Sequence, residues 1–146
     1  MNAIEFRMLE AGDHALLMNA VTDVFDNDID ARLAAEFLAD DRHHLAAAID
    51  NGRVVGFASG VHYVHPDKPA EMWINEVGVA DAYQGRGIGK AVMKTLLEHA
   101  RKLACANAWV ITERSNTAAM ALYASTGGRE SAPDEVMLTF HLDASA

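Results

Sequence analysis

Apolar and polar positions alternate along this chain with two different periods, and each stretch predicts one element of secondary structure. Alternation every two residues, or a short apolar run, predicts strands over 4–8, 45–49, 54–61, 72–79, 108–112 and 136–142. Spacing of three to four residues predicts helices over 13–24, 30–39, 87–104 and 116–123. The Asn51-Gly52 pair between two apolar runs predicts a tight hairpin turn.

The predicted element order is β-α-α-β-β-β-α-β-α-β, which indicates a mixed α/β (α+β) fold. We expect one central, mostly antiparallel sheet that carries helices on both of its faces. No internal repeat and no Pro/Gly/Ser-rich linker divides the 146 residues, so a single domain is predicted over 1–146.

Charge narrows the classes of partner that we expect. The chain has 12 Lys and Arg against 21 Asp and Glu, a net charge of −9, and such a surface repels phosphate backbones and anionic lipids. Neither nucleic acid nor a membrane is therefore expected as a partner. Residues 1–7 lack the basic start of a signal peptide, and the lone cysteine, Cys105, excludes an internal disulfide, so a cytoplasmic protein is predicted.

The most informative segment is the glycine-rich turn 84–90, where a predicted strand passes into a predicted helix. Three of its residues, Gly85, Gly87 and Gly89, are glycines, and Arg86 and Lys90 add positive charge. Backbone N–H groups in such a turn can point outward, and the helix N-terminus adds roughly half a positive charge. This combination predicts a phosphate or pyrophosphate site rather than a plain glycine cap.

Two common phosphate-binding motifs do not fit this turn. A P-loop requires glycine where the chain has Gln84, and serine or threonine where it has Ala91. The dinucleotide-binding fingerprint requires a third glycine at the position of Lys90. The turn therefore belongs to another class of phosphate site.

With these motifs the chain resembles the GNAT acetyltransferase superfamily, whose pyrophosphate signature is Gln/Arg-x-x-Gly-x-Gly/Ala. The segment 84–89 (QGRGIG) satisfies that signature. The segment 116–128 is similar to the family's Asn-x-x-Ala-x-x-Leu-Tyr-x-x-x-Gly-Phe helix, with Gly128 in place of phenylalanine. Acidic residues before the predicted last strand make the chain most similar to the small aminoglycoside 3-N-acetyltransferases.

The resemblance implies direct transfer of an acetyl group from acetyl-CoA to an amine, with no covalent enzyme intermediate and no metal. The Val79 amide is then expected to polarise the thioester carbonyl, and Tyr123 to protonate the departing thiolate. A core aromatic is the alternative for Tyr123. The positions expected to bind the cofactor are Val77, Gly78, Val79, Gln84, Gly85, Arg86, Gly87, Ile88, Gly89, Lys90, Asn116, Ala119 and Tyr123.

An amine must lose a proton before it attacks, so this chemistry also needs a base. Glu113, just past the end of a predicted strand, is the first candidate, and Glu76 is the second. Solvated carboxylates at strand ends are the alternative interpretation for both.

Charge also bears on the acceptor, because residues 23–41 contain seven acidic residues and one basic residue. In the family this region walls the acceptor site, so the resemblance implies a small polycationic amine, and first an aminoglycoside acetylated at its 3-amino group as in antibiotic resistance. Helix capping is the alternative for Asp26, Asp28 and Asp30. The predicted acceptor contacts are Asp26, Asp28, Asp30, Glu76, Glu113, Asp134 and Glu135.

Other interpretations stay open. The acceptor can instead be a polyamine, a small metabolite or a protein N-terminus, and a non-catalytic acyl-CoA-binding module is the alternative outside enzymes. His62 and His65 lack a clustered third ligand, so no metal site is predicted, and Cys105 is more typical of a packed thiol than of a nucleophile. The predicted last strand leaves a homodimer open.

Overall fold

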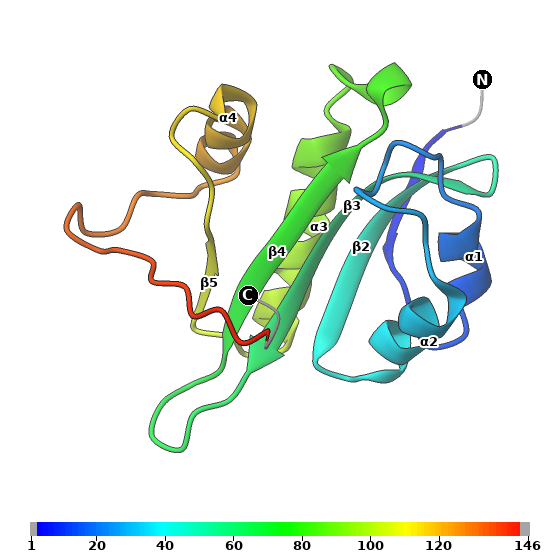
Figure 1. The fold of residues 1–146 in the computed structure, drawn as a ribbon. Coiled ribbons are helices and arrows are strands. Elements are labelled where there is room, and N and C mark those ends of the chain that lie inside the picture. The colour runs from blue at the N-terminus through cyan, green and yellow to red at the C-terminus, as the bar shows by residue number, and fades with distance from the viewer. Residues whose placement is uncertain (1–2, 144–146) are drawn as a thin grey trace.

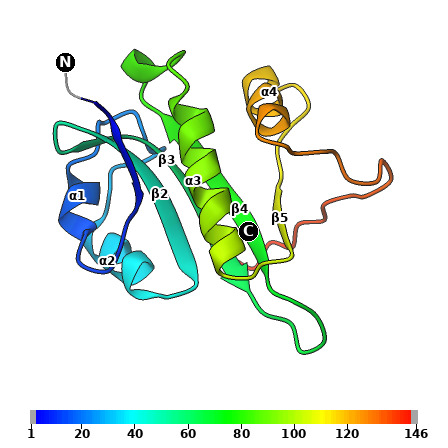
Figure 2. The same ribbon diagram turned by 180° about the vertical axis from the view of Figure 1, so that it is seen from behind.

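The computed structural model describes residues 3–143, which form one sheet with helices on both of its faces (Figures 1 and 2). The strands are β1 (Glu5–Met8), β2 (His43–Asp50), β3 (Arg53–Tyr63), β4 (Glu71–Val79) and β5 (Asn107–Val110). The helices are α1 (His14–Met18), α2 (Ala31–Ala39), the short 3-10 helix η1 (Asp81–Tyr83), α3 (Ile88–Lys102) and α4 (Thr117–Ser125). The predicted mixed α/β fold class is confirmed. Residues 1, 2 and 144–146 of the predicted domain lie outside the described part.

The five strands lie in the order in which they occur along the chain. Neighbouring strands from β1 to β4 are antiparallel, and β5 pairs with β4 in parallel. The sheet is therefore mostly antiparallel, as predicted. Asn51 and Gly52 have φ angles of 50° and 76°, the left-handed pair that a tight two-residue hairpin turn requires.

Two apolar layers hold the helices against the sheet. On one face, the amphipathic helix α3 buries Val92 and Leu96 completely against strand residues such as Met72. On the other face, α1 and α2 bury Leu17 and Leu38 in a second cluster, and they contact β3 and β2 respectively. The two helical faces of the sheet thus match the sequence prediction.

The first helix is shorter than predicted, because it ends at Met18 instead of continuing to residue 24. The Val21 amide donates a hydrogen bond to the Val54 carbonyl of β3, at 3.0 Å. The Asp23 carboxylate accepts one from the Asp81 amide of η1, at 2.8 Å. These tertiary hydrogen bonds replace the intrahelical ones, so residues 19–30 form an irregular segment beside the sheet.

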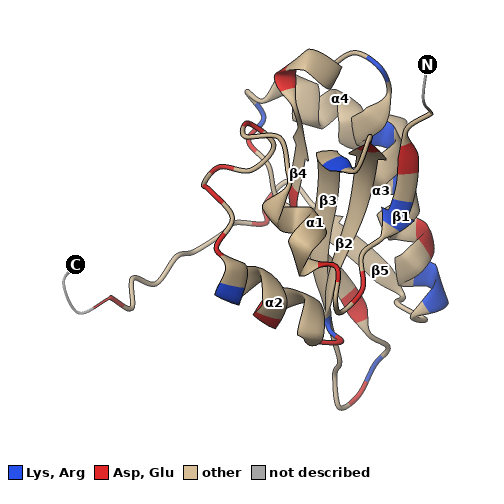
Figure 3. Cartoon of the chain, turned by 90° about the vertical axis from the view of Figure 1, so that its right-hand side faces the viewer, with Lys and Arg blue, Asp and Glu red and all other residues tan. Residues whose placement is uncertain are grey.

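The prediction of a last strand over 136–142 is wrong for the chain as the structure shows it. This segment forms no strand, and it projects away from the body of the molecule (Figure 3). Its apolar side chains are largely exposed, with 77% exposure at Leu138 and 81% at Phe140. Alternating apolar residues form a strand only beside a partner edge, and β5 offers a short edge because it ends at Val110 rather than at the predicted residue 112.

Candidate active site

The glycine-rich turn connects η1 to the long helix α3, with its backbone open to solvent. Gly85 and Gly87 both have a φ of 78°, a conformation that glycine adopts far more readily than other residues. A Cβ atom at either position would meet no atom within 4 Å, so the space beside the turn is free. Gly87 is the N-cap of α3 and brings no capping side chain, which leaves first-turn amides for an anionic ligand.

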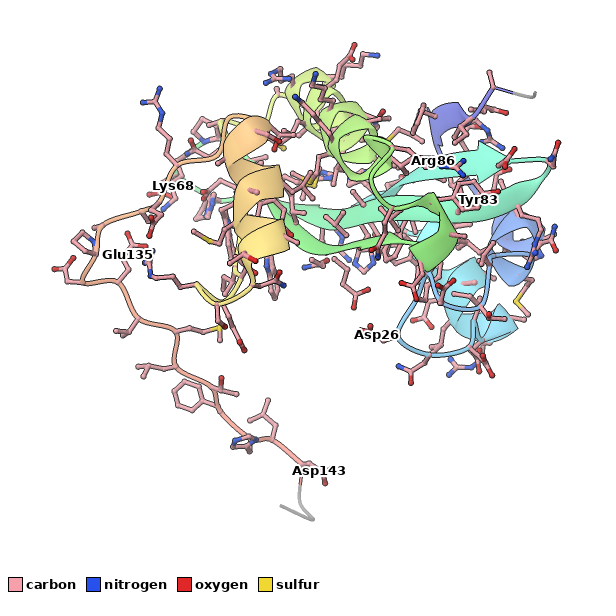
Figure 4. The ribbon with its side chains drawn as sticks, turned by 90° about the horizontal axis from the view of Figure 1, so that it is seen from above. Asp26, Lys68, Tyr83, Arg86, Glu135 and Asp143 are labelled. Carbon is pink, nitrogen blue, oxygen red and sulfur yellow. The ribbon has the colours of Figure 1, made fainter. Side chains whose placement is uncertain are left out.

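Side chains around the turn also suit it to binding an anionic ligand. The Arg86 guanidinium lies 4.9 Å from the centre of the Tyr83 ring, a cation–π contact that holds it beside the turn (Figure 4). The Tyr83 hydroxyl in turn donates a hydrogen bond to the Asp50 carboxylate. The Gln84 amide group donates to the Val79 carbonyl at 3.4 Å and so ties the turn to the end of β4. The sequence interpretation missed Tyr83, whose role depends on the β2 residue Asp50.

Strand β4 presents an unpaired edge next to this turn. Its pairing with β5 ends at Ile74 and Val110, so among the described residues 75–79 pair with a strand only on the β3 side. Beyond this point β5 diverges from β4 (Figure 1). A Cβ atom at Gly78 would lie 2.4 Å from the Val24 carbonyl oxygen, so glycine is needed for this close approach. An extended arm of a ligand can add to such an edge as a further strand.

Tyr123 lies half-buried on α4, beside the start of α3. Its side chain packs against the apolar cluster on the α3 face, and burial raises the pKa of its phenol above the usual value. The group therefore keeps its proton at neutral pH and can serve as an acid. Asn116 caps α4, as predicted, by accepting a hydrogen bond from the Ala119 amide at 3.1 Å.

An acidic hollow of about 290 Å³ opens where the 25–30 loop faces β3 and β4. Its lining includes four of the predicted acceptor residues, namely Asp26, Asp28, Asp30 and Glu76. Asp30 also caps α2 by accepting a hydrogen bond from the Leu33 amide at 3.0 Å, so the capping alternative is confirmed for this residue. Of the other acidic residues in 23–41, Glu36, Asp40 and Asp41 lie on or directly after α2 (Figure 3), whereas Asp23 accepts its hydrogen bond from η1.

The other predicted acceptor residues lie apart from this hollow. Glu135 lines a second, larger hollow of about 720 Å³ beside β5 and α4, which Tyr123 also lines. Glu113 and Asp134 line neither hollow, although Thr112 and Arg114 on both sides of Glu113 line the larger one. Glu113 lies apart from the acidic hollow because the chain turns toward α4 after β5. Asp134 and Glu135 lie apart from it because the C-terminal segment does not return to the sheet.

The histidines considered for metal binding have protein partners instead. His62 Nδ1 lies 2.7 Å from His44 Nε2, and His65 Nε2 lies 2.7 Å from the Glu71 carboxylate. Within residues 3–143 no group of three or more His, Cys, Asp or Glu side chains is arranged so that it could hold a metal ion. In the same part of the chain no helix is long and apolar enough to cross a membrane.

Fold and site together define the class of protein: an α/β domain with an open glycine-rich turn before its central helix and an acidic hollow on the opposite face of its sheet. Residues 13–127 match the model of the acetyltransferase (GNAT) family. The chain belongs to this family. Acetyl-CoA is the acyl donor of the family, and the open space beside Gly85 and Gly87, the uncapped start of α3 and the nearby Arg86 guanidinium fit its pyrophosphate.

The chain is similar in sequence to the N-alpha-acetyltransferase RimI of Mycobacterium tuberculosis, with 37% identity over 90 residues. This match covers 62% of the chain and 54% of the relative, so the chain spans about half the length of that protein. The fold is similar to that of the aminoglycoside acetyltransferase meta-AAC0020 from a soil metagenome, solved with sisomicin, at a TM-score of 0.78 and 15% identity over 94% of this chain and 97% of that one. It is also similar to the aminoglycoside N-acetyltransferase AAC(6')-Iy in complex with CoA, at a TM-score of 0.77 and 16% identity over 97% and 96% of the two chains.

Proposed function

We propose that the chain is an acetyl-CoA-dependent N-acetyltransferase that acts on a small polycationic amine, and first on the 3-amino group of an aminoglycoside. The observation that carries this proposal is the position of Glu76. It lines the acidic hollow together with Asp26 and Asp28, and it lies on the same strand as Val79, the strand that leads through η1 to the glycine-rich turn. The groups that we propose attract the acceptor, remove its proton and bind the cofactor therefore all lie at or beside the second half of β4.

The residues divide the work of the reaction between them. Acetyl-CoA supplies the activated acetyl group. The amides of the turn and the Arg86 guanidinium bind phosphate, while the open edge of β4 orients the donor and the Val79 amide faces the charge that develops on the carbonyl oxygen. A carboxylate oxygen of Glu76 takes the proton of the acceptor amine, and Tyr123 Oη holds the proton that the leaving group requires.

We assign the removal of the amine proton to Glu76 rather than to Glu113. Glu76 lines the acidic hollow, which the 25–30 loop also lines, whereas Glu113 lines neither hollow. A base must come within hydrogen-bond reach of the proton that it removes, directly or through one water molecule. The shared hollow supports Glu76 on this criterion.

Two other acceptors follow from specific observations. The similarity to RimI favours a protein N-terminus, which would need an open groove for a peptide. The acidic loop alone also suits a linear polyamine. A non-catalytic acyl-CoA-binding module would use the turn but would need neither the hollow nor Tyr123.

The proposed reaction uses acetyl-CoA, a cytoplasmic metabolite, so we propose that the protein acts in the cytoplasm.

The reaction is tested by its product. Gentamicin incubated with the protein and acetyl-CoA is expected to gain one acetyl group, which two-dimensional NMR assigns to the 3-amino nitrogen of the deoxystreptamine ring. Acetylation at another amine would keep the enzyme class and correct the position. Recovery of unmodified gentamicin, under conditions where the protein binds acetyl-CoA, would contradict the aminoglycoside assignment.

We also propose that the protein is a homodimer in which segment 136–142 of one copy pairs with the other. The exposed alternating side chains of this segment, which joins no strand within the described residues, support the proposal. Sedimentation velocity is expected to show a dimer that Phe140→Asp converts to monomer. Val64→Asp, at a loop residue that is 76% exposed, is the matched control and should leave the dimer intact. A monomeric wild-type protein at all concentrations would contradict this arrangement.

A further inference from the structure

Two tryptophans form an exposed stack on the sheet. The rings of Trp73 and Trp109 lie nearly parallel, at 10°, with their centres 5.2 Å apart. They face each other directly in the register of β4 and β5, and their exposed fractions are 40% and 36%. Aromatic side chains of this size normally contribute to cores or to binding surfaces, so an open stack points to a ligand.

The stack lies on the same face of the sheet as the acidic hollow. A register shift in the pairing of β3 with β4 makes Ser59 pair with Glu76, whereas Val61 pairs with Trp73. This bulge inserts one extra residue into β4 and turns Glu76 to the face that Trp73 occupies. Ile74, between them, points to the opposite face and is buried in the α3 cluster.

The stack is held in place by polar contacts at its edge. Trp109 Nε1 donates a hydrogen bond to the Tyr63 hydroxyl oxygen at 2.7 Å. The Tyr63 ring packs edge-on against His65, whose Nε2 atom lies 2.7 Å from the Glu71 carboxylate. Because the polar atom of this indole already has a partner and one of its ring faces is stacked on Trp73, its outer ring face is what remains to bind a ligand.

The stack borders the larger hollow through Trp109, and the groups around this position indicate which ligand would bind there. Trp109 lines the larger hollow, beside Ile111, and Glu76 lines the acidic one. Helices α1 and α2 cover the other half of this face, over β3 and β2. An indole face attracts a cation and also packs against an apolar ring, and the acidic residues next to it add attraction for positive charge.

We propose that the Trp73–Trp109 stack is the platform on which one ring of an amino-sugar acceptor lies flat, with a protonated amine over the indole. The inference rests on the proposed function and specifies its acceptor. Two residues, Ile74 and Asn75, lie between Trp73 and Glu76, and because of the bulge the two positions oppose Val61 and Ser59 of β3, a span of about 7 Å. A ring on the stack therefore leaves room for a second, linked ring at Glu76, so the site favours amino sugars of two or more rings over a single ring.

The chain itself provides the probe that tests this platform. Trp73 and Trp109 are its only two tryptophans, so emission excited where tyrosine does not absorb comes from the stack alone. Titration with neamine, which has two rings, is expected to change this emission at concentrations near its KM. The single ring 2-deoxystreptamine and the linear amine spermidine should require at least about tenfold higher concentrations. Unchanged emission at saturating neamine would overturn the proposal.

Substitution gives a second, independent readout. Trp73→Ala is expected to raise the KM for neamine about tenfold with the KM for acetyl-CoA unchanged, and Trp73→Phe should restore most of the affinity. Phe6→Ala is the matched control, because Phe6 is an aromatic residue of similar exposure, 38%, on the opposite edge strand β1. A Trp73→Ala enzyme that keeps its KM for neamine, or one whose main change is in sedimentation, would overturn the proposal and make the stack a packing or subunit surface.

The two proposals fail in different ways. Acetylation of neamine with no change in emission and no effect of Trp73→Ala removes the platform and keeps the enzyme. If neither neamine nor gentamicin is acetylated, the proposed acceptor is wrong. The emission titration then still decides whether an amino sugar binds at the stack.

Discussion

At the scale of single residues, the site depends on groups whose surroundings suit one protonation state. Tyr123 is the clearest of these, since burial disfavours its charged form and keeps the phenol neutral. Glu76, by contrast, is exposed at the wall of the acidic hollow, where its carboxylate is open to an acceptor amine and to water. The two residues therefore suit the acid and base roles assigned to them.

Tyr123→Phe is expected to lower kcat by roughly 10²-fold, the usual contribution of a positioned acid, because the variant has no proton to give. The affinity for acetyl-CoA should stay the same, since the ring still packs against α3. Steady-state rates and equilibrium binding measure the two effects. Ser125→Ala, which removes another hydroxyl from α4, controls for disturbance of the helix. An unchanged kcat would remove Tyr123 from the acid role.

Single residues also show what the sequence could predict about the site. The turn 84–89 was found because its glycines and charges are adjacent in the chain. The acidic residues were found by their density, but their division between two hollows depends on how the chain turns after β5. Tyr83 and Arg86 are only three residues apart in the chain. Trp73 and Trp109, by contrast, meet only because β5 pairs with β4, so no local pattern in the sequence predicts their stack.

At the scale of elements, the glycine-rich turn and the start of α3 together form the proposed phosphate site. Gly87→Val is expected to abolish acetyl-CoA binding, because a side chain would fill the free space beside the turn. The positive φ adds backbone strain of roughly 1–2 kcal/mol. Gly12→Val is the matched control: Gly12 also has a positive φ, 99°, and free space around its Cβ position, but it lies in the turn before α1. Binding retained by Gly87→Val would contradict the pyrophosphate assignment.

A second element-scale feature is a row of three histidines that joins β2, β3 and α3. His44 Nε2 lies 2.7 Å from His62 Nδ1, and His44 Nδ1 lies 3.0 Å from His99 Nε2. Burial, with further contributions from His99, His62 and His43, lowers the pKa of His44 to about 4 from 6.5, while Asp40 acts weakly in the opposite direction. His99 also has a lowered pKa, caused first by burial and then by Lys102 and His62.

This row predicts a loss of stability in acid. Between pH 6.5 and about 4 the unfolded chain binds a proton at this position that the folded chain does not, so stability falls as the pH falls through that range. The loss from His44 is at most about 3 kcal/mol. Urea unfolding at pH 7 and pH 4.5 measures it, and His44→Gln should reduce the difference. His14→Gln, at an exposed histidine, is the control; equal pH dependence in both variants would contradict the account.

Elements whose stability is local were predicted well, and those that need distant partners were not. The hairpin at Asn51-Gly52 and the amphipathic helix α3 follow from residues that are adjacent or one turn apart. The end of α1 depends instead on two hydrogen bonds, one that the Val21 amide donates to β3 and one that the Asp23 carboxylate accepts from η1. Segment 136–142 has the pattern of a strand, but its chain offers no long edge for it to join.

At the scale of the whole molecule, acidic residues are concentrated on the side that we propose binds the acceptor. Asp26→Asn, Asp28→Asn and Asp30→Asn combined are expected to raise the KM for gentamicin roughly tenfold and to weaken its dependence on salt. Asparagine keeps the cap of α2 at position 30, so the variant tests charge rather than folding. Glu98→Gln, on the exposed surface of α3, is the control. An unchanged KM would reduce the three residues to structural caps and loop charges.

The central claim is that the turn and the acidic hollow together transfer acetyl groups to a polycationic amino sugar. The most direct measurement is the rate of thiol release from acetyl-CoA with gentamicin, spermidine or a short peptide as the acceptor. The account predicts rapid release with gentamicin and much slower release with the other two. Release only with the peptide or with spermidine would contradict the acceptor assignment, and no release with any of the three, from a protein that binds acetyl-CoA, would contradict the proposed catalysis.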